Sequence, residues 1–375
     1  MQTAIPATLM RGGTSRGVFF HASDLPVGVD LRNQVLLALM GSPDLRQIDG
    51  VGGAHPLTSK VAVLSPPTRS DADIDYLFLQ VSVDKAQVSD GQNCGNILAG
   101  VGPWAIENGY VAATGDTTAI RIHMCNSNSM VVATVNTPNG VVDYTGEARI
   151  DGVPGTAAPV SLEFLDVAGA TCGALLPTGN AVDVVDGIDV TCIDNGMPVV
   201  VMRAADLGKS GYETPAELEA DAALKERVEA IRLAVAKRMN LGVVSDKTVP
   251  KMCLIAAPVA GGSVCTRSFI PQRVHDAIGV LAAVSVATVC LLPGSVAAGI
   301  ANVASSATNS DTSMSIQVEH PSGFFTVSLS METTKDTIRV RRSALLRTAR
   351  KLFRGEVYVP SHVWDGENRE IHHDH

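Results

Sequence analysis

Aromatic and charged residues are scarce in this chain. Aromatic side chains make up 4% of its 375 residues and charged ones 18%, whereas 46% are hydrophobic. The core of a globular protein with this composition has to be filled by Val, Ala, Leu and Ile. The formal net charge of −9 argues against a general nucleic-acid-binding surface, because such a surface needs a basic face. An anionic substrate therefore has to be attracted by local groups.

The sequence also lacks the features of secreted, metal-binding and membrane proteins. Its seven cysteines are an odd number and have no metal-site spacing, so we expect reduced thiols in a cytoplasmic protein and no ligand cluster. The first residues show no basic segment before an apolar core, so no signal peptide is expected. The most apolar stretch, residues 278–292, is short for a membrane span. We expect no nucleic-acid partner, no membrane partner and no metal or other cofactor.

The length of the chain predicts two domains, and its 34 glycines suit a β-rich fold with many tight turns. Periodicity predicts helices over residues 30–40, 94–108, 214–239 and 273–292. Short strands are predicted near residues 4–20 (two strands), 60–64, 75–83, 119–123, 130–135, 141–144, 181–185, 189–193, 198–203, 251–256, 314–319, 324–331, 338–343 and 355–359. This pattern is α+β, with an apolar helix near the middle of each half. We place the N-terminal half at residues 1–187 and the C-terminal half at 188–375, with its tail crossing back.

A cysteine between turn-forming residues is the most informative local feature. Residues 91–96 read GQNCGN and precede the apolar residues 97–106. Asn93 is a candidate N-cap for the helix predicted there, which puts Cys94 in the first turn. The unpaired N–H groups and positive dipole end of a helix activate a thiol and attract a carboxylate. Cys94 is either a reactive thiol beside an anion site or a small buried apolar side chain.

A lysine stands at the entry to an apolar strand. Lys60 follows Ser59 and precedes Val, Ala and Leu residues. Such a lysine usually extends its ammonium group to solvent. An apolar environment would instead favour the neutral amine, which can act as a general base.

Two further segments offer donors for carboxylates. Residues 11–15 read RGGTS, in which two glycines allow close backbone approach and Arg11 supplies a cation; the alternative is an ordinary glycine hairpin. Arg267, beside Ser268, could bind a second carboxylate or form only a surface ion pair. His275 precedes the second apolar helix and is either a ligand-binding or a capping residue.

Taken together, four segments resemble the PrpF-type isomerases. They are residues 10–15 (MRGGTS), 41–50 with GSPD and QIDG, 57–62 (LTSKVA) and 92–98 (QNCGNIL), in this order. The resemblance is dense over residues 9–108 and looser towards the end of the chain. It implies a diaminopimelate epimerase-like fold, in which two pseudo-symmetric halves each wrap a mixed sheet around a central helix.

The resemblance also implies site residues. Proline racemase and diaminopimelate epimerase use one cysteine from each half, but the second central helix here begins HDAIG at residues 275–279, without a thiol. The resemblance therefore points to Lys60 and Cys94 as the acid/base pair. The expected substrate-binding residues are Arg11, Gly12, Gly13, Thr14, Ser15, Ser59, Gln92, Asn93, Gly95, Asn96, Arg267, Ser268 and His275.

The activity implied is a cofactor-independent shift of a proton or double bond in an unsaturated oxo-tricarboxylate. The resemblance favours 4-oxalomesaconate, an intermediate in gallate and protocatechuate catabolism, through keto–enol tautomerisation or allylic isomerisation. An aconitate or methylaconitate isomerase is the alternative. A non-catalytic carboxylate-binding protein of the same fold is an alternative of another class. A homodimer is possible, although nothing in the sequence requires one.

Overall fold

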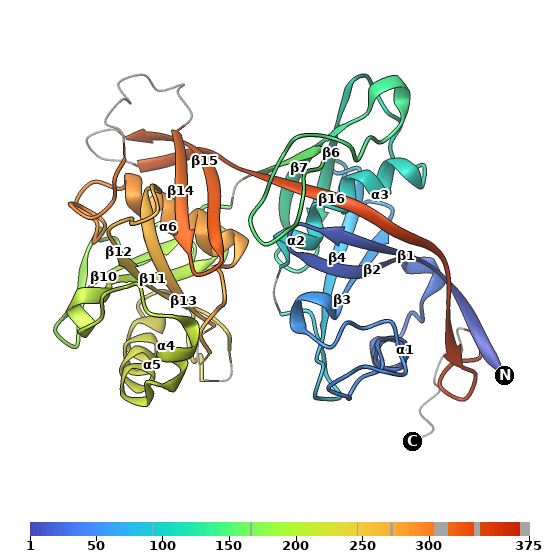
Figure 1. Cartoon of the computed structure of the whole chain (residues 1–375), viewed down its shortest axis with the longest axis horizontal. Helices are drawn as coiled ribbons and strands as arrows, with labels where there is room; N and C mark the ends of the chain where they lie inside the picture. The colour runs from blue at the N-terminus through green and yellow to red at the C-terminus, as the bar shows by residue number, and fades with distance from the viewer. Residues whose placement is uncertain are drawn as a thin grey trace. The chain divides into compact units, whose positions relative to one another are not determined.

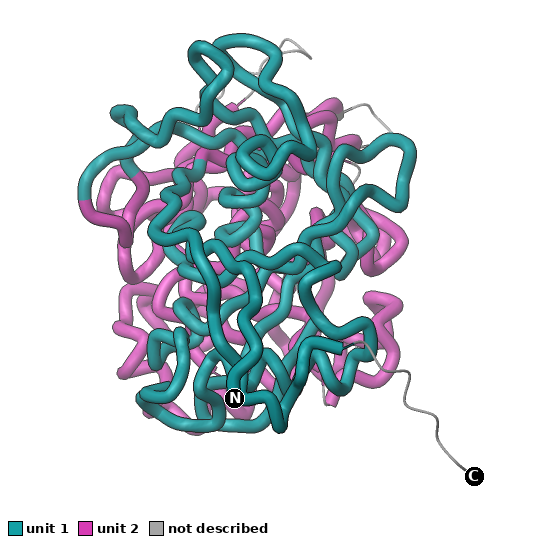
Figure 2. Tube along the Cα trace, turned by 90° about the vertical axis from the view of Figure 1, so that its right-hand side faces the viewer, with its two compact units in different colours: residues 1–149, 155–162, 347–375 teal, residues 150–154, 163–346 magenta. Residues whose placement is uncertain are grey.

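The computed structural model describes residues 1–91, 93–165, 167–245, 247–270, 273–303, 314–333 and 338–367. The chain forms two compact units (Figure 2), of which unit 1 holds residues 1–149, 155–162 and 347–375, and unit 2 holds residues 150–154 and 163–346. The C-terminal segment, residues 347–375, thus belongs to unit 1. The expected boundary after residue 187 falls inside unit 2, because β9 (Asp183–Val185) and β10 (Ile188–Asp194) pair as a hairpin across it.

Unit 1 is built on a mixed set of strands. Antiparallel pairs β1–β2, β3–β4 and β6–β7 are joined by the parallel pairs β2–β3 and β4–β6. The last part of β16 pairs with β1. The bounds are β1 (Gln2–Gly12), β2 (Ser15–His21), β3 (Lys60–Ser65), β4 (Ile74–Val81), β5 (Val88–Ser89), β6 (Thr117–Met124), β7 (Ser129–Asn136), β8 (Pro159–Leu165) and β16 (Ile338–Pro360).

Helices of unit 1 use different faces of these strands (Figure 1). Helix α1 (Val29–Met40) packs in one hydrophobic cluster with Val61, Leu79 and their neighbours. Helix α2 (Gly95–Leu98) contacts β1 and β2, and α3 (Val101–Glu107) contacts β6 and β7. The single helix expected over 94–108 is therefore two helices. Pro103 explains the break, because it has no N–H for the carbonyl four residues earlier.

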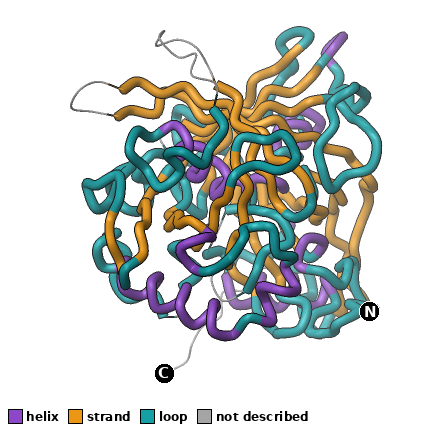
Figure 3. Tube along the Cα trace, turned by 60° about the vertical axis from the view of Figure 1, so that its left-hand side comes forward, coloured by secondary structure: helices purple, strands orange, loops and turns teal. Residues whose placement is uncertain are grey.

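Unit 2 has its own mixed strands. Antiparallel pairs β10–β11, β12–β13 and β14–β15 are joined by the parallel pairs β11–β12 and β13–β14, and β15 pairs with the first part of β16. Figure 3 shows how far strands outweigh helices in the chain. The remaining bounds are β11 (Pro198–Arg203), β12 (Lys251–Ala256), β13 (Val264–Phe269), β14 (Met314–His320) and β15 (Gly323–Thr333).

The described residues of unit 2 form the α-helices α4 (Pro215–Ala220), α5 (Ala222–Ala236) and α6 (Val280–Leu291). Helix α5 packs in a hydrophobic cluster with Met252 and Leu254, and α6 contacts β10, β11, β14 and β15. Residues 280–289 of α6 are all buried. None of the helices in the described ranges is long and apolar enough to cross a membrane. The described helices and strands show that the protein belongs to the α+β class.

Several predicted elements differ from the structure. Residues 141–144 form no strand after the left-handed Asn139, and the strands expected at 338–343 and 355–359 are parts of β16. Asp221 divides the helix expected over 214–239 and caps α5 through Leu224 N–H. Helix α6 begins at Val280 and not near 273, because extended pairing continues from β13 through the bridge between residues 269 and 274.

Candidate active site

Lys60 is the first residue of β3 and is nearly buried, with 6% of its surface exposed. The strand register sets it beside Gly17 of β2 and opposite Gln80 of β4. Its Nζ donates a hydrogen bond of 2.7 Å to Gln80 Oε1 and lies 5.0 Å from the centre of the Phe78 ring. Lys60 therefore does not extend to solvent, and its amine is held over β4.

The segment before Lys60 is held by two glutamines. Gln80 Nε2 donates to the carbonyl oxygens of Ser59 at 2.8 Å and Pro56 at 3.1 Å. Ser59 is fully buried, and its Oγ accepts a 2.7 Å hydrogen bond from Gln47 Nε2. Ser59 thus forms its hydrogen bonds with other residues of the protein, and these bonds fix the chain just before β3.

Cys94 is the N-cap of α2, a position that the sequence assigned to Asn93. Its carbonyl accepts the first helical hydrogen bond from Leu98 N–H, and its side chain makes no capping bond. Tyr76 O–H donates to the same carbonyl at 3.3 Å. Burial, and then the neighbouring Cys94, raise the pKa of Tyr76 well above its ordinary value, so its hydroxyl remains a donor.

Both expected catalytic residues lie over one face of β4. Since alternate residues of a strand share a face, Tyr76, Phe78 and Gln80 form one stripe. Lys60 contacts the Phe78 and Gln80 end of this stripe, and the backbone of Cys94 contacts its Tyr76 end. The Lys60 amine and the backbone of Cys94 thus lie on the face of β4 opposite the one that packs against α1.

The turn between β1 and β2 is fitted to the first turn of α2. Asn96 Nδ2 donates to Thr14 Oγ1 at 3.1 Å, and Asn96 Oδ1 accepts from Thr14 N–H at 3.4 Å. A Cβ on Gly12 would overlap the Asn96 carbonyl oxygen, and one on Gly13 would overlap the Asn96 side chain. Gly13 also has a φ of +50°, which favours glycine. The two glycines thus allow the turn to reach the helix start next to Gly95.

Arg11 holds the same turn from the other side. Its Nη1 donates to the carbonyl oxygens of Gly13 at 2.9 Å and Thr348 at 3.0 Å, and to Thr348 Oγ1. Burial, and then Arg350, lower the pKa of Arg11. Arg11 thus links the turn to β16, because the hydrogen bonds of its Nη1 go to oxygen atoms of the protein.

Ser15 Oγ, next to the β1–β2 turn, and Asn93 Oδ1, next to Cys94 in the chain, are buried without a hydrogen-bond partner among the residues that the structure describes. Buried polar atoms normally have a partner, so these two are available to a ligand or to water. Gln92, also expected in the site, lies outside the described residues.

The expected residues of unit 2 form a local group of their own. Arg267 of β13 is largely buried and donates through Nε to the Glu213 carbonyl. The Ser268 carbonyl accepts from His275 N–H at 2.8 Å. His275 Nδ1 accepts from Ala277 N–H at 2.9 Å, so His275 shapes the turn ahead of α6. The pairing that continues from β13 brings Ser268 and His275 together, and Arg267 precedes Ser268 in the strand.

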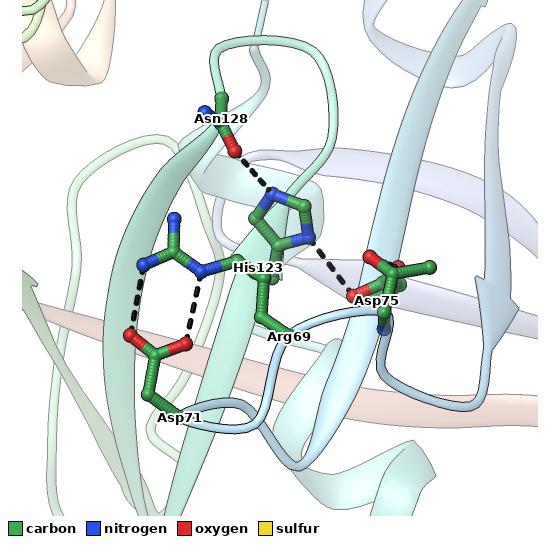
Figure 4. A network of polar contacts seen from close by, with 6 residues as sticks. Arg69, Asp71, Asp75, His123 and Asn128 are labelled. Carbon is green, nitrogen blue, oxygen red and sulfur yellow. Dashed lines mark hydrogen bonds and ion pairs between the residues drawn. The ribbon is translucent and has the colours of Figure 1, made fainter.

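One group of residues that could hold a metal ion lies elsewhere in unit 1, although no such cluster was expected. Ligand atoms of Asp75, His123 and Cys125 lie within 4.8 Å of one another. Figure 4 shows His123 bridging Asp75 and Asn128, with both hydrogen bonds at 2.9 Å. Burial and then Asp75 raise the pKa of Cys125 to about 11, so its thiol stays protonated near neutrality. Asp75 points to the opposite face of β4 from Tyr76, so this group is separate from Lys60 and Cys94.

Sequence reasoning missed three residues that build the site. Tyr76 and Gln80 lie within a predicted strand, where the alternation of Tyr76, Phe78 and Gln80 indicated a common face. Gln47 is buried in a loop, and its Oε1 accepts from Ala54 N–H at 2.9 Å. Apart from its place in the QIDG motif, nothing in the sequence around Gln47 indicates that this glutamine is buried beside the site.

Comparisons with known proteins agree over almost the whole chain. Residues 2–360 match the family model described as PrpF protein. A 4-oxalomesaconate tautomerase of Pseudomonas putida is 58% identical, with 98% of this chain and 99% of that protein covered. A (4E)-oxalomesaconate Delta-isomerase of Novosphingobium sp. (strain KA1) is 59% identical, with 94% and 97% covered. The crystal structure of a methylitaconate-delta-isomerase superposes with a TM-score of 0.81 at 34% identity, with 96% and 97% covered.

Proposed function

The chain belongs to the PrpF protein family and is an isomerase, and we propose that it acts on 4-oxalomesaconate, shifting a proton or double bond without a cofactor. The relatives named for this substrate are 58% and 59% identical to the chain. This assignment puts the enzyme in aromatic-acid catabolism in the cytoplasm. Its seven cysteines are free, which suits a reducing compartment.

The observation that carries the proposal is the arrangement of Lys60 and Cys94 over the Tyr76–Phe78–Gln80 stripe. Isomerisation by proton transfer needs two groups that can exchange protons with a bound substrate. The Lys60 amine and the thiol of Cys94, whose backbone contacts the same stripe, are the groups proposed for this exchange.

The proposed reaction starts when the neutral Lys60 amine removes a proton from a carbon next to the substrate carbonyl. The C–H electrons move into the conjugated system, giving a dienolate and a Lys60 ammonium. The Cys94 thiol then gives its proton to the dienolate oxygen or to the far carbon of the allyl system. Proton transfer from ammonium to thiolate, directly or through solvent, restores both groups. Ser15 Oγ and Asn93, which have unpaired buried atoms, are the proposed polar contacts for the substrate.

We also propose that the two units are pseudo-symmetric halves of a diaminopimelate epimerase-like fold. The succession of antiparallel and parallel pairs from β1 to β7 recurs from β10 to β15, which supports this. In each unit a helix follows the fourth strand of this succession: α2 follows β4 and β5, and α6 follows β13. Arg267, Ser268 and His275 of unit 2 are also proposed to bind substrate carboxylates.

The decisive experiment compares the wild type with Lys60→Met and Cys94→Ser. The ultraviolet change of 4-oxalomesaconate reports turnover, and NMR in D₂O reports which carbon gains deuterium. Each substitution should lower kcat by about 10²–10⁴-fold, the usual contribution of an acid or base. Lys85→Met, at an exposed lysine in the turn after β4, is the matched control. Wild-type turnover by both site variants would refute the mechanism.

Aconitate and methylaconitate test the substrate assignment separately. With the wild type, 4-oxalomesaconate should give the highest kcat/KM of the three tricarboxylates. A higher value for either competitor would reassign the substrate, while the response to Lys60→Met would still test the chemistry.

A further inference from the structure

The amide of Gln80 can adopt only one orientation. Its Nε2 faces the carbonyl oxygens of Ser59 and Pro56, which accept hydrogen bonds and cannot donate them. A flipped amide would set oxygen against oxygen on that side. Its Oε1 must therefore face Lys60 Nζ, at 2.7 Å.

Gln80 Oε1 accepts from the Lys60 amine, whose position is also restricted by its other neighbours. Lys60 and Gln80 are directly opposed in the β3–β4 ladder, so their side chains share a face. The ring of Phe78, two residues away, bounds the amine on a second side. Gln80 is itself hydrogen-bonded to Pro56 and Ser59, just before β3. The acceptor and the start of β3 are therefore held in a fixed relative position.

The charge of the acceptor affects which protonation state of the lysine amine is favoured. A glutamine oxygen orients a lysine amine in either protonation state, because the neutral amine still has N–H groups to donate. A carboxylate at the same place would stabilise the ammonium form and oppose its use as a base. A neutral acceptor therefore suits a lysine that has to gain and lose a proton in each turnover.

We propose that Gln80 is a positioning residue for the Lys60 amine, holding it for proton transfer while leaving its protonation state free to change. This inference rests on the proposed function, in which Lys60 is the base. It assigns to Gln80 a role in kcat and in its pH dependence, with a smaller role in substrate binding.

The test uses Gln80→Leu and Gln80→Glu, with kcat and KM measured from pH 6 to 10. Gln80→Leu should lower kcat by about 10–100-fold at every pH, as expected for a misplaced catalytic group, with a smaller change in KM. Gln80→Glu should move the acidic limb of the kcat profile to higher pH, so that activity recovers as pH rises. Gln87→Leu and Gln87→Glu, at an exposed glutamine of the neighbouring turn, are the matched controls and should leave both profiles unchanged.

A second measurement separates this inference from the proposed function. Trinitrobenzenesulfonate modifies neutral amines, and peptide mass spectrometry gives the rate at Lys60 against pH without any substrate. Gln80→Glu should shift that rate profile to higher pH, and Gln80→Leu should not. Unshifted profiles in both assays would overturn the inference. A shifted modification profile in an enzyme that turns over no tricarboxylate would instead refute the proposed function alone.

Discussion

Asn96 occupies the space in which any side chain on Gly13 would have to stand. The contact joins the β1–β2 turn to the helix that begins directly after Cys94. Asn96 also bonds to both the backbone and the hydroxyl of Thr14. The position of the α2 start is thus set by a turn more than 80 residues earlier in the chain.

Gly13→Ala should therefore impair catalysis as well as stability. An alanine at a φ of +50° costs about 1 kcal/mol in conformational energy, and its Cβ must also displace Asn96. Gly109→Ala is the matched control, because Gly109 has a φ of +77° with open space around the missing Cβ. Urea unfolding should show a loss of stability in both variants, whereas kcat should fall only in Gly13→Ala. Equal kcat values would contradict the role assigned to the Gly13–Asn96 contact.

The elements near the site were largely predictable because the signals are local. The turn at residues 12–14, the start of β3 at Lys60 and the helix after Cys94 follow from glycine placement and apolar runs. The Thr214–Glu217 capping box at the start of α4 is likewise a pattern of neighbouring residues. Each of these features depends on residues within a few positions of one another.

Features that depend on distant residues were not predictable. The pairing of Asp75 with His123 comes from the parallel β4–β6 register, which no local pattern specifies. The bond from Gln80 to Lys60 depends in the same way on the β3–β4 register. The prediction divided the 23-residue β16 into two strands. Its middle is rich in Arg and Lys, so the alternation of apolar and polar residues is interrupted there and resembles the end of a strand.

Tyr76→Phe should weaken both the fold and the placement of Cys94. It removes the hydroxyl that donates to the Cys94 carbonyl, with an expected loss of about 1 kcal/mol in the free energy of unfolding. We expect kcat to fall by less than about 10-fold, because the Leu98 N–H still bonds to the same carbonyl. Tyr212→Phe is the control, since Tyr212 O–H donates to the Ala257 carbonyl in unit 2. A loss of kcat in Tyr212→Phe as large as that in Tyr76→Phe would argue against a specific effect on Cys94.

Lys251→Met should stabilise the protein at neutral pH. Burial, and then Arg232, lower the pKa of Lys251 to about 8, and its Nζ has no hydrogen-bond partner within the described ranges. Below pH 8 the folded protein has to bury an ammonium, at a cost of about 3 kcal/mol for this shift from 10.5. The cost falls as pH rises from 8 and is absent above 10.5, where both states are neutral.

The difference in the free energy of unfolding between Lys251→Met and the wild type should thus be largest at pH 7 and shrink towards pH 10. Urea unfolding across this range measures it. Lys237→Met, at an exposed lysine after α5, should show no such trend. A difference that stays constant with pH would mean that the amine is not the cause.

Under the proposed function, in which Cys94 lies at the substrate, Cys94 should be the first thiol alkylated by iodoacetamide at pH 7.5. The pKa values of the other six thiols are raised, which slows their alkylation. Burial is the first cause in each case: it raises the pKa of Cys125 to about 11 and that of Cys172, Cys192 and Cys290 to about 12, and it also raises the pKa of Cys253 and Cys265. Alkylation requires the thiolate, so even the exposed Cys125 should react slowly until the pH approaches 11. Peptide mass spectrometry over time gives the rate at each cysteine. A saturating tricarboxylate should protect Cys94 and leave Cys125 unaffected, with Cys94→Ser as the blank. Modification of Cys125 ahead of Cys94, or no protection by any tricarboxylate, would remove the thiol from the proposed site.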